Sequence, residues 1–94
     1  MPETLERIIV ELDGNPLDFL FIDGDHYGVE QDYMMYAPLV RAGGIVSFHD
    51  IVSGPKENVG VVPAYWMQVK QGRDTLEIVE SWSQGGWGIG VIRV

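Results

Sequence analysis

Side chains that can bind a metal or move a proton follow two short apolar runs in the sequence. They are Asp23, Asp25, His26, His49 and Asp50. Carboxylates alone favour Mg²⁺ or Ca²⁺, and an imidazole among the ligands shifts the preference towards Mn²⁺, Fe²⁺ or Zn²⁺. An imidazole whose pKa is near neutrality can also take a proton from a substrate hydroxyl, and His26 is the candidate for that role.

The same residues also have a purely structural interpretation. Asp25 can cap the helix that follows it, and Asp23 and Asp50 can accept hydrogen bonds within turns. The two histidines would then be polar loop positions that take part in hydrogen bonds. Residue types and spacing leave both interpretations open.

The two apolar runs are predicted to be strands that bring these side chains together. Four successive apolar residues, 19–22, are typical of a strand buried on both faces, as in a parallel sheet covered by helices. We expect this strand at residues 18–23, a helical pattern over residues 29–40 that Pro38 kinks or breaks, and a second strand at residues 45–48. Neighbouring parallel strands lie about 5 Å apart, so the polar residues at their carboxyl ends should face one crevice.

The rest of the chain completes an α/β pattern. We expect an amphipathic helix at residues 5–12, a glycine stop at 41–44, a mobile loop at 51–60, a helix from residue 61 or 63 to 71, and strands at 75–82 and 87–94. The last two strands are close enough to pair as an antiparallel hairpin. The glycines between residues 85 and 90 indicate a hairpin turn and not a phosphate loop, because no helix follows them.

The aromatic residues allow two interpretations. Tryptophan and tyrosine side chains commonly belong to a core, and the alternative is a pocket for a flat substrate. The residues concerned are Trp66, Trp82, Trp87, Tyr27, Tyr33, Tyr36 and Tyr65.

Composition limits the classes of protein that the sequence fits. The 94 residues, 46% of them hydrophobic, predict one globular domain with a small core. A net charge of −8 opposes binding to nucleic acid, because a positive surface for phosphates is missing. No apolar run approaches the roughly 20 residues of a membrane span, and cysteine is absent. We therefore expect a cytoplasmic protein that binds neither nucleic acid nor membranes.

Several motifs occur in an order that is found in a known family. They are the segments 17–27, 37–40, 43–44, 48–51 and 86–92, together with Asp32. In this order they resemble the carboxyl-terminal half of a class I S-adenosylmethionine-dependent methyltransferase, within the group of cephalosporin-hydroxylase-like proteins and metal-dependent O-methyltransferases. The resemblance implies a partial Rossmann-like sheet with flanking helices, comprising strands four to seven of the family's seven, the last of them antiparallel. Residues 1–94 would form one truncated domain without the amino-terminal, cofactor-binding half.

The resemblance also implies roles for individual residues. Asp23, His49 and Asp50 match the metal-binding positions, although His49 departs from the usual oxygen ligand. His26 matches the general base of the catechol-type enzymes. Gly24 and Asp25 match the segment that approaches the cofactor.

Three functional hypotheses follow. The first is O-methyl transfer to a small-molecule hydroxyl, with a divalent metal such as Mg²⁺ or Mn²⁺ and with S-adenosylmethionine bound when the missing half is supplied. The second is an inactive remnant or oligomerising module, because loss of the neighbouring strand exposes an apolar edge that a second copy or a partner chain should cover. The third and weaker hypothesis is a small metal-dependent hydrolase that uses Asp23, Asp25, His26 and His49.

Overall fold

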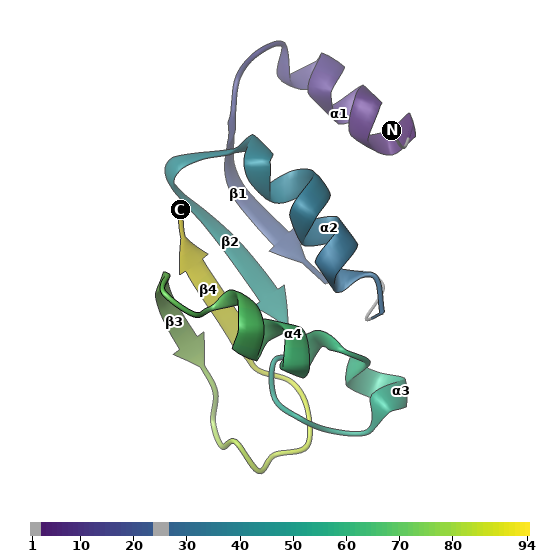
Figure 1. The fold of residues 1–94 in the computed structure, drawn as a ribbon, viewed down its shortest axis with the longest axis vertical. Coiled ribbons are helices and arrows are strands. Elements are labelled where there is room, and N and C mark those ends of the chain that lie inside the picture. The colour runs from purple at the N-terminus through teal and green to yellow at the C-terminus, as the bar shows by residue number, and fades with distance from the viewer. Residues whose placement is uncertain (1–2, 24–26) are drawn as a thin grey trace.

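The computed structural model describes residues 3–23 and 27–94, which form one mixed sheet with helices (Figure 1). The elements are α1 (Glu3–Leu12), β1 (Leu17–Ile22), α2 (Val29–Tyr36), the 3₁₀ helix η1 (Ala37–Leu39), β2 (Val40–His49), α3 (Lys56–Val59), α4 (Val62–Val69), β3 (Asp74–Ile78) and β4 (Ile89–Arg93). None of the helices in this described part has the length and apolar character needed to cross a lipid bilayer.

The sheet has the strand order β1-β2-β4-β3. β1 and β2 are parallel, and β4 is antiparallel to both of its neighbours. The predicted α/β class, the parallel first pair and the antiparallel hairpin of the last two strands are therefore confirmed. In Figure 1, α2 and α4 lie across the same face of the sheet, whereas α1 lies beyond one end of it.

The core lies between the sheet and the two helices that cover it. Trp66 of α4 is fully buried, and its ring centroid lies 5.5 Å from that of Phe48 on β2. A Cβ atom added to Gly90 of β4 would lie only 2.7 Å from three atoms of the Trp66 ring. The indole therefore packs directly on the backbone of β4, at a position that only glycine leaves open. For Trp66, the core interpretation of the aromatic residues is therefore correct.

Among the described residues, little covers the opposite face of the sheet. Phe19 and Phe21 of β1 are 53% and 43% exposed, whereas Ile22 on the other face is buried. The prediction that this run is buried on both faces was wrong here, because α2 and α4 both pack on the Ile22 side. Leu76 and Ile78 of β3 continue the exposed apolar face.

The helix predicted over residues 29–40 ends earlier than the spacing of its apolar residues indicated. Pro38 divides it as expected: α2 ends at Tyr36, and a 3₁₀ turn holds the proline. The glycine stop at residues 41–44 was wrong, because these residues lie inside β2. Gly43 donates its amide to the Val94 carbonyl at 2.6 Å, and Gly44 accepts from the Val94 amide at 2.9 Å. This pairing with the end of the chain extends the strand, and β1 meets it through an irregular register.

The segments between the later elements also differ from prediction. The expected loop at residues 51–60 contains α3, and the last two strands are shorter than predicted, because β3 ends at Ile78 and β4 begins at Ile89. Trp82 and Trp87 lie in the long connection between these strands and are largely exposed. Their expected place in the core was therefore wrong. The structural reason is that the connection runs beyond the end of the sheet, where α4 does not reach (Figure 1).

Candidate metal and substrate site

Parallel pairing of β1 with β2 sets the position of the candidate site. Ile22 is in register with Phe48, so the residues that follow them, Asp23 and His49, are neighbours at the carboxyl ends of the two strands. Ligands of open α/β sheets bind at this end of the strands. Asp50 comes next in the chain and completes the group.

The carboxylates of Asp23 and Asp50 converge on one nitrogen of the His49 imidazole. Nδ1 of His49 lies 3.0 Å from Oδ1 of Asp23 and 3.2 Å from Oδ2 of Asp50. One ligand atom from each residue falls within 4.8 Å of the other two. Side-chain exposure falls from 48% for Asp23 to 25% for His49 and 11% for Asp50, so the group extends from the surface to the edge of the core.

Backbone geometry holds Asp50 in this group. Its φ is +65°, a left-handed conformation that few residues other than glycine adopt. Its amide donates to the Gly88 carbonyl at 3.0 Å, and Ile51 and Val52, which follow it, are fully buried. The chain therefore turns sharply after β2 and keeps the Asp50 carboxylate against His49.

The donor set fits a divalent cation. Two carboxylates and one imidazole, within 4.8 Å of one another, supply the oxygen and nitrogen ligands that Mn²⁺, Fe²⁺ and Zn²⁺ accept. Without a cation, a neutral imidazole can donate its Nδ1 proton to only one of the two carboxylates at a time. The described contacts also fit a histidine hydrogen-bonded in that way, so the role of Asp23, His49 and Asp50 as metal ligands stays a prediction.

An open cavity of about 390 Å³ lies beside this group. It is lined by His49, Asp50, Glu57, Asn58, Val59, Gly85, Gly86 and Trp87. The Trp87 ring stands roughly edge-on to the His49 ring, with 6.1 Å between their centroids. Sequence analysis missed Glu57 and Asn58, because they belong to a helix of only four residues inside a predicted loop.

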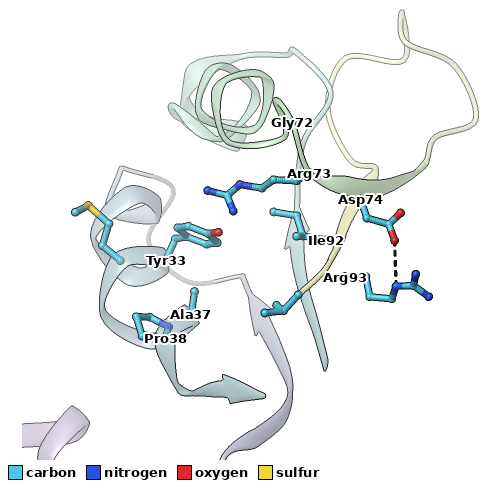
Figure 2. A pocket seen from close by; sticks show the side chains of 10 residues that line it. Tyr33, Ala37, Pro38, Gly72, Arg73, Asp74, Ile92 and Arg93 are labelled. Atoms are coloured by element: carbon cyan, nitrogen blue, oxygen red, sulfur yellow. Dashed lines mark ion pairs between the residues drawn. The ribbon is translucent and has the colours of Figure 1, made fainter. Parts of the chain in front are cut away.

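A larger cavity, about 520 Å³, lies at the other end of the sheet (Figure 2). There Arg93 at the end of β4 is paired with Ile45 in the middle of β2, whereas His49 at the end of β2 is paired with Ile89. Arg93 and Asp74 form an ion pair of 3.0 Å at its edge, and the Arg73 guanidinium lies 5.9 Å from the centre of the Tyr33 ring. This cavity is well separated from the carboxylate and imidazole group.

Three predicted site residues are outside the described ranges. They are the candidate base His26 and the candidate cofactor residues Gly24 and Asp25. The segment that follows them contacts the site region, because the Tyr27 hydroxyl donates to the Lys56 carbonyl at 3.3 Å. The chain after β1 is thereby connected to the start of α3.

Comparisons with known proteins agree with the fold. Residues 1–51 match the family model of a methyltransferase domain. A protein of Dictyostelium discoideum named "Probable caffeoyl-CoA O-methyltransferase 1" is 36% identical over an alignment 62 residues long, which covers 61% of this chain and 27% of that protein.

Solved structures share the fold over nearly the whole chain. The O-methyltransferase from Bacillus cereus in complex with SAH has a TM-score of 0.66 at 19% identity, and the match covers 98% of this chain and 46% of that one. The O-methyltransferase TomG from Streptomyces achromogenes in complex with SAM has a TM-score of 0.64 at 20% identity, covering 95% and 46%. The chain therefore spans about a quarter of the length of its curated relative and just under half of these structures.

The chain belongs to the methyltransferase domain family, since the family model matches more than half of its residues. The resemblance seen in the sequence motifs is thus confirmed. The expected partial Rossmann-like sheet is confirmed by the strand order and by the shared fold.

Proposed function

We propose that this chain is the metal- and substrate-binding half of an S-adenosylmethionine-dependent O-methyltransferase. The observation that carries the proposal is the convergence of Asp23, His49 and Asp50 at the carboxyl ends of two parallel strands. It is supported by the family match and by relatives whose names describe O-methyl transfer.

Asp23, His49 and Asp50 would hold the divalent cation, Mg²⁺ or Mn²⁺. When bound, such a cation supplies positive charge that favours the deprotonated form of a substrate hydroxyl. Asp50 is the best placed of the three to stay rigid, because it is the least exposed and its amide is hydrogen-bonded to Gly88. The cavity beside His49 would position the substrate, and positioning is a large part of the rate gain in such transfers.

His26 is the proposed base, on sequence grounds alone. It follows β1 by a few residues and would accept the proton of the acceptor hydroxyl. S-adenosylmethionine, when bound, supplies the methyl group. Gly24 and Asp25 are the proposed contacts of this chain with the cofactor, and the remaining contacts would come from the part of the fold that the matched structures contain and this chain does not span.

Calorimetric titration of the purified chain with S-adenosylmethionine, with and without Mn²⁺, tests this function. We expect Mn²⁺ to bind the chain alone, and binding of S-adenosylmethionine tighter than about 100 μM (roughly −5.5 kcal/mol) would rule out an inactive remnant. When the missing half is supplied as a second polypeptide, we expect methyl transfer to catechol that falls by at least about tenfold in His26→Ala. If the chain binds neither Mn²⁺ nor S-adenosylmethionine, the proposal is wrong.

A second candidate function, self-assembly, is favoured by the free edge of β1. Within the described residues, β1 is the first strand of the sheet and pairs only with β2. The sequence Phe19-Leu20-Phe21 is the same in both directions. If two copies paired antiparallel with Leu20 opposite Leu20, Phe19 of each copy would lie opposite Phe21 of the other. Such a pairing, in which Phe19 contacts Phe21 of the second copy and Phe21 contacts Phe19, has the geometry of a two-fold interface. Light scattering tests it: we expect a dimer, and a monomer at about 100 μM would rule out this candidate.

A further inference from the structure

Trp87 stands out among the residues near the metal group. It is 67% exposed at the rim of the 390 Å³ cavity, although tryptophan gains more from burial than almost any other residue. Its φ is +64°, which for a bulky side chain is a genuine outlier. Both features have an energetic cost, and neither contributes to the core.

The contacts of the backbone explain how this conformation is kept. The Trp87 carbonyl accepts from the Val52 amide at 3.1 Å, and the next carbonyl, that of Gly88, accepts from the Asp50 amide at 3.0 Å. A Cβ atom added to Gly54 would lie 2.5 Å from the Gly85 carbonyl oxygen, so the two loops pack backbone to backbone. The loop that carries Trp87 is thus fixed to the residues that follow β2, including a predicted metal ligand. Outliers that are held in this way are common at functional sites.

The surroundings of the ring indicate what it binds. The indole is 6.1 Å from the His49 ring, so a molecule in the cavity beside Trp87 also lies near the proposed metal. Glu57 and Asn58 of α3 line the same cavity and offer carboxylate and amide groups for hydrogen bonds. An exposed aromatic face near polar groups suits a ring that carries hydroxyl groups, because the ring can stack while its hydroxyls are hydrogen-bonded.

We propose that Trp87 is the stacking surface for a hydroxylated ring of the acceptor substrate, with Glu57 and Asn58 as hydrogen-bonding partners of its hydroxyls. This inference rests on the proposed function and assigns the specificity of that site to residues outside the metal group. A catechol and a pyranose both combine a ring face that can stack on an indole with hydroxyl groups that can form hydrogen bonds.

The test is calorimetric titration of the full chain, in the presence of Mn²⁺, with catechol and separately with methyl α-D-glucopyranoside. We expect one of the two rings to bind. Trp87→Ala should weaken that binding by at least about tenfold (about 1.4 kcal/mol), whereas Trp87→Phe should stay within about threefold, because a flat ring is kept. Trp82→Ala is the matched control, since Trp82 is also exposed in the same connection, and it should leave binding unchanged.

A second measurement separates substrate binding from a structural role. Trp87→Gly removes the side chain and relieves the positive φ, so its melting temperature should equal or exceed that of the wild type. A lower melting temperature would mean that Trp87 stabilises the loop, and the inference would then be wrong. It would also be overturned if neither ring binds the wild type, or if Trp87→Ala binds as tightly as the wild type.

Mn²⁺ affinity distinguishes this inference from the proposed function. Trp87 contributes no ligand atom, so Mn²⁺ should bind all four variants as it binds the wild type. Normal Mn²⁺ binding together with an unaltered ring affinity in Trp87→Ala would overturn only the inference. Loss of Mn²⁺ binding in the wild type would instead contradict the proposed metal site.

Discussion

The two faces of the sheet are both apolar but have different surroundings. On the covered face, Phe48 and Ile92 lie under Trp66 and α2 and are almost fully buried. On the open face, Phe19 and Phe21 keep about half of their surface exposed. The contrast shows that similar side chains on adjacent strands differ in how much they contribute to stability, because α2 and α4, within the described part of the chain, both pack on the same face. Stability should therefore come from the covered face, and the open face is available for other contacts.

The largest expected effect is that of Trp66→Ala on the covered face. Removing a fully buried indole costs about 3–5 kcal/mol of unfolding free energy in other proteins. In a domain of this size such a loss should unfold much of the protein at 37 °C. Urea denaturation followed by circular dichroism measures it, and a loss below about 1.5 kcal/mol would show that the covered face is not the main source of stability.

Gly90→Ala should have the next largest effect. The added methyl group would meet three atoms of the Trp66 ring at 2.7 Å, so the indole or the strand must move, at a cost of about 1–3 kcal/mol. Combining it with Trp66→Phe provides the control, because the smaller ring leaves room. The double variant should be more stable than the sum of the single losses predicts, and simple additivity would contradict the packing described here.

Glu77→Gln tests the polar contact of the covered face. The indole Nε1 of Trp66 and the Lys70 amine donate to one Glu77 carboxylate oxygen at 2.7 and 2.9 Å. The hydrogen bond from Trp66 and, secondly, the contacts with Lys70 lower the pKa of this carboxyl, and partial burial opposes them. We expect Glu77→Gln to lose about 1 kcal/mol at pH 7.

The pH dependence of that loss has a definite direction. Because the pKa of Glu77 is lower in the folded than in the unfolded chain, the carboxylate stabilises the fold fully above the unfolded value of 4.5. The stabilisation is lost as the pH falls through the lower, folded value. The difference between wild type and Glu77→Gln should therefore shrink below about pH 4, and a difference that stays constant from pH 7 to pH 3 would contradict the assigned contacts.

Phe19→Ser on the open face should have the smallest effect on stability. Half of the side chain is already exposed, so the change in unfolding free energy should stay within about 1 kcal/mol. If the open face and the β1 edge bind a second copy, the same variant should dissociate the dimer in light scattering. A stability loss as large as that of Trp66→Ala would mean that the two faces do not differ as described.

The sequence predicted the part of the site that depends on local pattern. Each apolar run ended in polar residues, and parallel pairing of the two strands was enough to bring Asp23 close to His49. The sequence pattern did not indicate that Phe19 and Phe21 are exposed on the open face. A run of apolar residues shows that a strand is hydrophobic, but it does not show which of its faces the helices cover. The glycines at 41–44 were misread because their role depends on hydrogen bonds to Val94, which is distant in sequence.

The position of Trp87 was also beyond sequence reasoning. Its exposure follows from close packing of Gly54 on Gly85 and from the hydrogen bond to Val52, and each of these contacts joins residues about thirty positions or more apart. Composition alone favoured a buried tryptophan, as is correct for Trp66. Two residues of the same type thus have opposite environments, which only the tertiary contacts determine.

Mn²⁺ binding to the purified chain, followed by electron paramagnetic resonance, tests the central claim most directly. Binding of one Mn²⁺ per chain is predicted, with affinity reduced at least about tenfold in Asp50→Asn and in His49→Ala. Asp74→Asn, at the other end of the sheet, should bind Mn²⁺ as the wild type does. Absence of binding below about 1 mM (roughly −4.1 kcal/mol), or equal losses in Asp74→Asn and Asp50→Asn, would contradict a metal site at the ends of β1 and β2.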